Sequence, residues 1–260
     1  MTTVAQAREI IHAASHVHFF TGAGMSADSG LDTFRDARTG LWERVNPQDM
    51  ASLEAWQRDP EPMWAWYLWR AHLAQKAKPH AGHKAIANLS RTVSVTTQNI
   101  DDLHERAGSG DAAHLHGSLF AFRCSSCHLP YPQDIELPNT PVERLSPPLC
   151  GNCGGSIRPG VVWFGEPLPQ DHWQKAEENI RAADAVVIVG TSGSVWPAAG
   201  LPTLAHRQGT PIIEISPQRS ELTDLATVWM EDTDDSRSTR TLLPVAHWYS
   251  ARWYGANCLV

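Results

Sequence analysis

Two pairs of cysteines have the spacing that points most directly to chemistry in this sequence. Cys124 and Cys127 form one C-x-x-C pair, and Cys150 and Cys153 form a second. Each pair places two thiolates on one turn, and four thiolates complete the tetrahedral coordination of a structural zinc ion, with no position open for substrate. We therefore predict one structural Zn²⁺. Four free or redox-active thiols are the alternative.

A glycine-rich turn is the second chemical signal. Residues 22–27 read GAGMSA and follow a short apolar run, so they match the G-x-G-x-x-A pattern of dinucleotide sites. Glycines there allow the backbone to approach a pyrophosphate, and the helix N-terminus supplies N–H donors. A plain turn without a ligand is the alternative. No acidic residue follows a second strand to hold the ribose, so the binding mode differs from that of an ordinary dehydrogenase.

Four short runs rich in β-branched residues alternate with helical stretches and would position these groups. The runs are His16–Phe20, Thr92–Thr97, Ala185–Val189 and Pro211–Ile215. The alternation predicts an α/β fold with a parallel sheet. Ligands bind beyond the carboxyl ends of the strands in such sheets, which is where the glycine turn lies.

Two stretches interrupt the alternation and predict a smaller, inserted domain. One is the Trp-rich helical stretch Asp59–Ala77, and the other is the Cys- and Pro-rich stretch Cys124–Pro159. We expect a Rossmann-like large domain of residues 1–35, 78–122 and 159–260, and a small helical and zinc-binding domain of residues 36–77 and 123–158.

Charge and hydropathy exclude several other classes of protein. Lys and Arg total 21 against 28 Asp and Glu, a formal charge of −7, which argues against a broadly basic nucleic-acid-binding surface. The longest uncharged run, Ala185–His206, contains Pro197 and Pro202 and is not a membrane-spanning helix. The first residues lack the pattern of a secretory signal. We expect a cytoplasmic protein with no membrane association.

Four further segments carry a resemblance to a known family. They are Gly22–Arg35 (GAGMSADSGLDTFR), Thr97–Gly108 (TQNIDDLHERAG), His116–Ser118 (HGS) and Arg158–Glu166 (RPGVVWFGE). Their order, with the four cysteines, resembles the sirtuins, NAD-dependent protein-lysine deacylases, over residues 5–225. The resemblance implies that NAD and an acylated-lysine protein bind between a Rossmann-type domain and a small domain.

The resemblance also implies the residues that contact NAD. Phe34 and Arg35 would lie in a loop that shields the cofactor. Ser216 stands where the family more often has Asn, so its contact with the adenosine ribose is less secure. The implied contacts are Gly22, Ala23, Gly24, Ser26, Phe34, Arg35, Gln98, Asn99, Ile100, Asp101, Gly190, Thr191, Ser192 and Ser216.

His116 is the catalytic base that the resemblance implies. An imidazole titrates near neutral pH and can accept a proton from a sugar hydroxyl. The implied reaction releases nicotinamide, O-acyl-ADP-ribose and free lysine. We interpret His114 as structural, and His80 and His83 as residues that cap and pack a helix.

Tyr67 and Arg70 predict the acyl group. They are three residues apart, so on a helix they share one face. A guanidinium and a phenol hydroxyl in an otherwise apolar acyl site suit an acyl group that ends in a carboxylate. This Y-x-x-R placement resembles the class III sirtuins, which remove succinyl and malonyl groups. A packing helix with Arg70 in solvent is the alternative.

The peptide substrate is expected to pair as an extended strand between two segments. The first is Val161–Phe164, with Val162, Trp163 and Phe164 as the substrate contacts, and the second is Gly193–Val195. Other functions remain open: a plain deacetylase, a mono-ADP-ribosyltransferase, a zinc-containing NAD oxidoreductase, or a zinc-ribbon module for nucleic acid. The resemblance fades after about Asp224, and the sequence does not give the oligomeric state.

Overall fold

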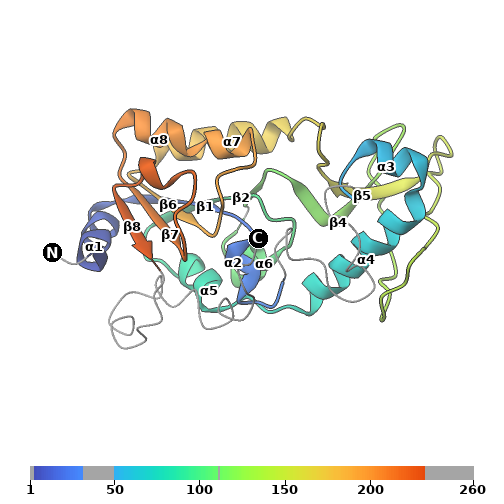
Figure 1. Ribbon diagram of the computed structural model, residues 1–260, viewed down its shortest axis with the longest axis horizontal. Helices are drawn as coiled ribbons and strands as arrows, with labels where there is room; N and C mark the ends of the chain where they lie inside the picture. Colours follow the sequence, from blue (N-terminus) through green and yellow to red (C-terminus); the bar gives the residue numbers. More distant parts are fainter. Residues whose placement is uncertain (1–2, 32–49, 111, 232–260) are drawn as a thin grey trace, which may run out of the picture.

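The computed structural model describes residues 3–31, 50–110 and 112–231. The molecule is elongated, with a larger and a smaller lobe placed end to end along its long axis (Figure 1). Phe34 and Arg35, which the resemblance places in a loop over the cofactor, lie outside the described residues.

The larger lobe is built on a six-stranded sheet in which every neighbouring pair of strands is parallel. The order across the sheet is β3 (Ala113–His114), β2 (Thr92–Thr97), β1 (His16–Thr21), β6 (Ala185–Val189), β7 (Ile212–Ser216) and β8 (Val228–Glu231). This confirms the predicted fold class and four of the strands. The prediction began the fourth strand at Pro211, one residue early, because proline has no N–H for the sheet ladder. The two edge strands, β3 and β8, were not predicted.

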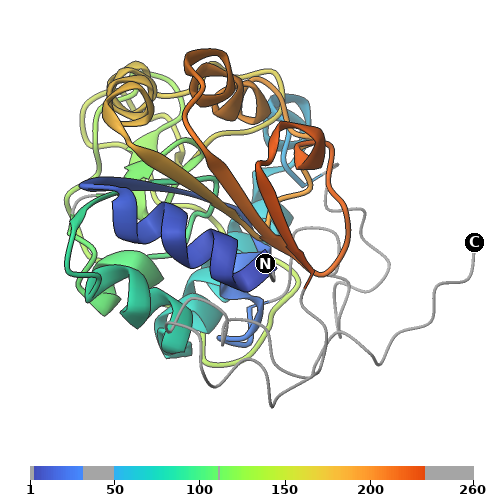
Figure 2. The ribbon, with the colours of Figure 1, turned by 90° about the vertical axis from the view of Figure 1, so that its left-hand side faces the viewer.

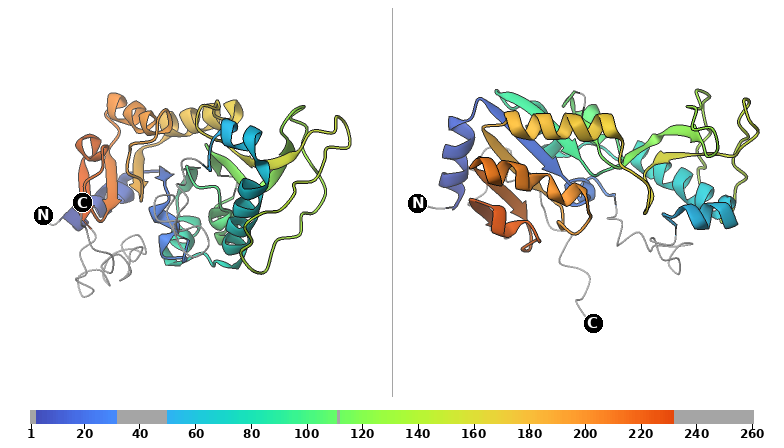
Figure 3. Two further views of the ribbon diagram at one scale, coloured as in Figure 1. Left: turned by 45° about the vertical axis from the view of Figure 1, so that its right-hand side comes forward. Right: turned by 90° about the horizontal axis from the view of Figure 1, so that it is seen from above.

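Helices cover both faces of this sheet, as a buried parallel sheet requires. Phe19 packs in the core on one face and Phe20 in the core on the other, because successive side chains of a strand point in opposite directions. Figures 2 and 3 show the sheet between the two helical layers. One layer holds α1 (Thr3–Ala13), α5 (Ala81–Ala87) and α6 (Leu103–Ala107), and the other holds α7 (Gln170–Ala182) and α8 (Pro202–Gln208). Three short elements lie in the connections: α2 (Gly24–Ala27), η2 (Ala198–Gly200) and η3 (Thr223–Leu225).

The smaller lobe packs two helices against an antiparallel strand pair. The strands are β4 (Gly117–Cys124) and β5 (Ile157–Val161), and the helices are α3 (Leu53–Arg58) and α4 (Pro60–Lys76). The hydroxyl of Ser52 caps α3 by accepting the N–H of Ala55. Helix α4 confirms the predicted Trp-rich helix, and its tryptophans lie in a core shared with β4 and β5.

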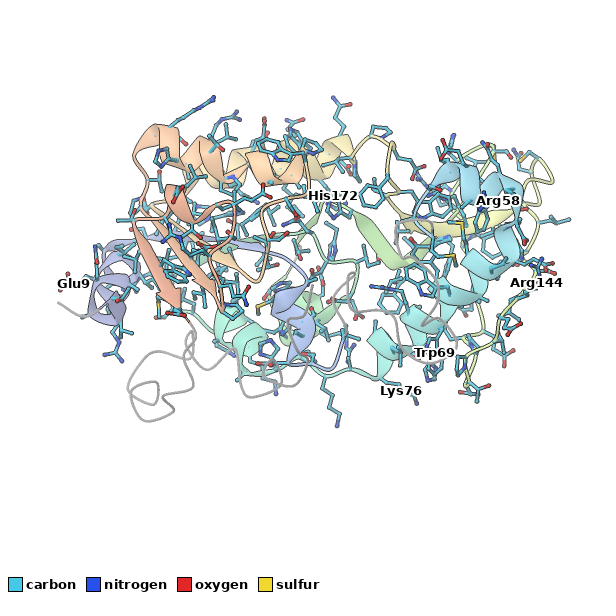
Figure 4. All side chains as sticks on the ribbon, in the orientation of Figure 1. Glu9, Arg58, Trp69, Lys76, Arg144 and His172 are labelled. Atoms are coloured by element: carbon cyan, nitrogen blue, oxygen red, sulfur yellow. The ribbon has the colours of Figure 1, made fainter. Side chains whose placement is uncertain are left out.

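An exposed ion-pair cluster joins the Cys-rich segment to the start of α4. The guanidinium of Arg144 lies 2.7 Å from Asp59 and 3.0 Å from Glu61. Figure 4 shows Arg144 beside the upper end of α4, at the end of the molecule opposite Glu9. The two inserted stretches therefore meet in one lobe, while the exact domain boundaries stay a prediction.

None of the helices in the described ranges has both the length and the apolar character that crossing a membrane needs.

The turns after β1 and β6 pack backbone against backbone. The N–H of Gly22 donates to Val189 O at 2.9 Å, and that of Gly24 donates to Gly190 O at 2.8 Å. A Cβ on Gly22 would lie 2.7 Å from Gly190 O and 2.8 Å from Thr191 Cβ, closer than atoms approach in real structures. Only glycine fits at position 22 without displacing the neighbouring turn.

Gly22→Ala is expected to lower the free energy of unfolding by about 1–3 kcal/mol, because the added methyl overpacks this contact. Thermal unfolding measures the loss. Gly151→Ala is the matched control, since a Cβ there meets nothing within 4 Å. Equal stability of the two variants would show that the two turns are not closely packed.

Candidate active site

The carboxyl ends of the central strands are joined by hydrogen bonds between their loops. Gln98, directly after β2, donates its backbone N–H to Thr21 O and its side-chain amide to Thr191 Oγ1, both at 2.9 Å. Leu115, after β3, donates to Thr97 O at 2.9 Å. Most of the predicted site residues lie in the loops after β1, β2, β3 and β6. These loops therefore meet at the carboxyl-terminal edge of the sheet, where these four strands end.

Ser26, Asn99 and Asp101 form a buried polar chain at this edge. The hydroxyl of Ser26 donates to Asp101 Oδ2 at 2.8 Å and accepts from Asn99 Nδ2 at 2.9 Å. Burial raises the pKa of Asp101, against the opposing effect of its bonds from Leu103 N–H and Ser26. Carboxamide, hydroxyl and carboxyl side chains together offer the donors and acceptors that a nicotinamide carboxamide and a ribose require. The donor set beside the glycine turn thus fits NAD.

His116 lies beside the same loops with a defined tautomer. Its Nδ1 lies 3.0 Å from Gln98 O, a carbonyl that only accepts, so Nδ1 carries the proton and Nε2 keeps its lone pair. Burial lowers the pKa of His116 below its usual value of 6.5, while the bond to Gln98 opposes this shift. A partly buried imidazole with a free Nε2 at neutral pH is suited to accept a proton.

The other histidines near the site make structural contacts. His80 caps α5 by accepting the N–H of Gly82 at 2.9 Å, which confirms its predicted capping role. His114 lies between Asn99 O and the Glu105 carboxylate, at 3.0 and 2.8 Å. His172, near the centre of Figure 4, accepts the backbone N–H of His114 at 3.1 Å.

Other residues predicted to contact NAD lie around this edge with varied surroundings. Ala23 precedes α2, the helix that begins at Gly24. The Ser192 hydroxyl lies 2.8 Å from that of Ser194. The hydroxyl of Ser216 donates to Gln218 O at 2.7 Å and accepts from the indole of Trp229 at 3.0 Å, so it is engaged within the protein.

The segment after β5, predicted to pair with the peptide, has its N–H groups already bonded. Val162 N donates to His116 O at 2.9 Å, Trp163 N to a Glu166 carboxylate oxygen at 2.8 Å, and Phe164 N to Ala51 O at 2.8 Å. A peptide strand that pairs here must therefore bond to the carbonyl oxygens of these residues or to neighbouring groups. Phe164 is 53% exposed, whereas Trp163 is buried.

A buried ion pair that the sequence patterns did not predict holds this segment. The Arg158 guanidinium donates two bonds to the Glu166 carboxylate, at 2.7 and 2.8 Å. It also lies 3.3 Å from the centroid of the Trp163 ring and donates to Val161 O. Both residues belong to the RPGVVWFGE motif, but their pairing across a turn is not visible in the motif itself.

Tyr67 and Arg70 lie on α4 as their spacing predicts. Tyr67 is buried, and its hydroxyl accepts the indole N–H of Trp163 at 2.9 Å. Arg70 is half-buried, with its guanidinium 4.9 Å from the centroid of the Trp66 ring. Burial raises the pKa of Tyr67 to about 12, although the positive charge of Arg70 acts in the opposite direction.

The four cysteines of the smaller lobe fit a single tetrahedral ion. Their sulfur atoms all lie within 4.8 Å of one another, with 3.4 Å between Cys124 and Cys153 and 3.7 Å between Cys127 and Cys150. Tetrahedral coordination with Zn–S bonds of about 2.3 Å places sulfurs about 3.8 Å apart. The backbone N–H groups of Ser126 and Cys127 point at Cys124 Sγ, which favours the thiolate.

Comparison with known protein families identifies the family to which this chain belongs. A family model described as the Sir2 family matches residues 22–197. The chain belongs to the Sir2 family. The four cysteines are accordingly the site of one structural zinc ion, as predicted from their spacing.

Curated sirtuin relatives and solved structures agree with this membership. A Corynebacterium efficiens protein named NAD-dependent protein deacylase 2 is 59% identical over 86% of this chain and 91% of its own. A Mycobacterium tuberculosis NAD-dependent protein deacylase is 50% identical over 84% of this chain and 92% of its own. The structure of a Sir2 homologue–NAD complex has a TM-score of 0.79 at 41% identity and covers 87% of each chain.

The sirtuin zinc site is expected to hold one Zn²⁺ per chain by elemental mass spectrometry. Cys150→Ser is expected to lose most of the metal and to destabilise the smaller lobe, because metal binding contributes folding free energy. Cys258→Ser, at the fifth cysteine of the chain, is the control and keeps the metal. Full metal content in Cys150→Ser would contradict the ligand set.

Proposed function

We propose that this NAD-dependent protein deacylase prefers acyl groups that end in a carboxylate, succinyl and malonyl above acetyl. The observation that carries the proposal is that Tyr67 and Arg70 lie three residues apart on α4, close enough for the charge of Arg70 to act on the Tyr67 hydroxyl. A hydroxyl inside an apolar core and a guanidinium beside it provide a donor and a positive charge to one acidic group. An acetyl group offers neither of them a partner.

A short chain of contacts links this pair to the proposed base. Val162 bonds to His116 through its backbone, and the next residue, Trp163, bonds to Tyr67 through its side chain. Two adjacent residues of one segment thus contact both the proposed base and the proposed acyl-binding tyrosine. This arrangement suits an acyl-lysine whose reacting carbon lies near His116 and whose far end reaches α4.

The residues at the sheet edge would hold NAD, which when bound supplies the ribose that takes the acyl group as nicotinamide leaves. The glycine turn would receive the phosphates, and the chain of Ser26, Asn99 and Asp101 would receive the nicotinamide and its ribose. Nε2 of His116 would accept the proton of a ribose hydroxyl, and Gln98 O would hold the ring in the required tautomer. The remaining proposed contacts are Ala23, Phe34, Arg35, Gln98, Ile100, Gly190, Thr191, Ser192 and Ser216.

The proposed partner is an acylated-lysine segment of another protein. A solved Sir2–p53 peptide–NAD⁺ structure has a TM-score of 0.75 with this chain at 27% identity, and covers 95% of this chain and 96% of its own. We propose that the peptide lies extended beside Val162 and Phe164 and opposite Gly193–Val195. The main-chain pairing available there reads little side-chain sequence, so broad protein specificity is expected.

His116→Ala is expected to lower kcat about 10²–10⁴-fold, the usual contribution of a general base, with NAD binding retained. In the native enzyme, activity is lost as Nε2 protonates. Because the pKa of His116 lies below 6.5, the acid limb of the kcat/KM profile should have its midpoint below that value. His12→Ala, on the exposed side of α1, is the control. An unchanged acid limb in His116→Ala would exclude His116 as the base.

Arg70→Met is expected to lower desuccinylation about 10- to 150-fold and deacetylation far less, because a charge-assisted hydrogen bond contributes about 1.5–3 kcal/mol. Kinetics on two peptides that differ only in the acyl group measure the ratio. Arg58→Met, at an exposed site in the same lobe (Figure 4), is the control. Equal losses of kcat/KM on both peptides would show that Arg70 does not select the acyl group.

A further inference from the structure

We infer that Trp163 is a specificity-positioning residue: its indole N–H occupies one side of the Tyr67 hydroxyl and so directs the O–H of Tyr67 at the carboxylate of the acyl group. The inference rests on the proposed preference for acidic acyl groups. It assigns Trp163 a side-chain role in addition to the main-chain role expected of its segment.

The hydrogen bond between the two side chains has only one possible direction. Trp163 Nε1 lies 2.9 Å from Tyr67 Oη, and the two residues are 2% and 4% exposed. Indole N–H is a donor without acceptor capacity, so the tyrosine oxygen must accept. A phenol O–H prefers the plane of its ring and has two orientations there. The indole donor fills one side, which leaves the O–H directed to the other.

The indole is itself fixed by three neighbours. The Arg158 guanidinium covers its face at 3.3 Å from the ring centroid, and the Trp56 ring lies 5.4 Å away. The backbone N–H of Trp163 donates to Glu166, whose carboxylate is bound by Arg158. Because these contacts leave the indole little freedom to swing, it can impose one orientation on the hydroxyl of Tyr67.

The Tyr67 hydroxyl keeps its proton under physiological conditions. Burial raises its pKa to about 12, and the charged groups that face it are Arg70, Arg158 and Glu166. A protonated phenol donates to a carboxylate, whereas a phenolate would repel one. The oriented O–H therefore acts together with Arg70 on the same acidic group.

A fixed orientation of the Tyr67 O–H would make this hydroxyl selective for an acyl group that ends in a carboxylate. An acyl carboxylate accepts the O–H, whereas an acetyl group is too short to reach it, so only the carboxylate gains this hydrogen bond. Without the indole N–H, the hydroxyl can rotate and its lone pair is free, so selection for the carboxylate weakens. Trp163 therefore acts through Tyr67, without touching the substrate carboxylate.

Trp163→Phe keeps an aromatic ring and removes only the N–H donor and part of the volume. It is expected to lower the succinyl-over-acetyl ratio of kcat/KM about 3- to 10-fold, the range of a neutral hydrogen bond. The loss should fall on KM and on the Kd of the succinyl-lysine peptide without NAD, with kcat nearly unchanged. A Tyr67→Phe background should abolish the effect. Trp64→Phe, at an indole of the same core that packs against Phe122, is the control.

A second measurement leaves Trp163 unchanged. Ultraviolet resonance Raman spectra report hydrogen bonding at indole N–H groups, and the difference between the native enzyme and Tyr67→Phe isolates the affected indole among the 11 tryptophans. One indole is expected to lose its hydrogen bond. This readout stands even if Trp163→Phe does not fold.

The outcomes separate the inference from the function on which it rests. A native enzyme with no preference for succinyl over acetyl peptide would refute the proposed function and the inference together. Four results would overturn the inference alone. In the kinetics they are an unchanged succinyl preference in Trp163→Phe, equal losses of kcat/KM on both peptides, or additive effects of Trp163→Phe and Tyr67→Phe. In the spectra it is an unchanged Raman signal in Tyr67→Phe.

Discussion

The close contact between the turns that follow β1 and β6 is the constraint on which the rest of the site depends. Gly22 meets Gly190 and Thr191 at distances that exclude any side chain, and backbone bonds from Gly22 and Gly24 lock the two turns together. Gln98 then bonds to both β1 and Thr191. Because Gln98 O also holds the imidazole of His116, the orientation of the proposed base depends on how these strand ends pack.

The second requirement is that the smaller lobe places its aromatic core against the same edge. The segment after β5 bonds to His116 on one side and packs into the core of α4 on the other. The Arg158–Glu166 ion pair holds its turn, and Trp163 reaches Tyr67 from it. Catalysis and acyl selection are thus proposed to share one rigid segment, so a change in either lobe would affect both.

The sequence predicted the elements that carry strong local patterns. Buried parallel strands such as Ala185–Val189 are nearly continuous apolar runs, and paired cysteines have a spacing that few other sites share. It missed β3, which has two residues, and β8, because short edge strands lack a distinct hydrophobic pattern. The bond between Tyr67 and Trp163 joins residues far apart in the chain, and only packing brings them together. Peptide pairing at Val161–Phe164 was expected as strand addition, but the sequence does not show that the N–H groups of Val162, Trp163 and Phe164 are already bonded within the chain.

A mass-spectrometric product balance for a succinyl-lysine peptide, incubated with and without NAD, is the most direct test of the account. The expected result is equal amounts of unmodified peptide, nicotinamide and O-succinyl-ADP-ribose, formed only when NAD is present. The succinylated peptide should react faster than the acetylated peptide of the same sequence. Unmodified peptide formed without NAD, or an acetylated peptide consumed as fast as the succinylated one, would contradict it.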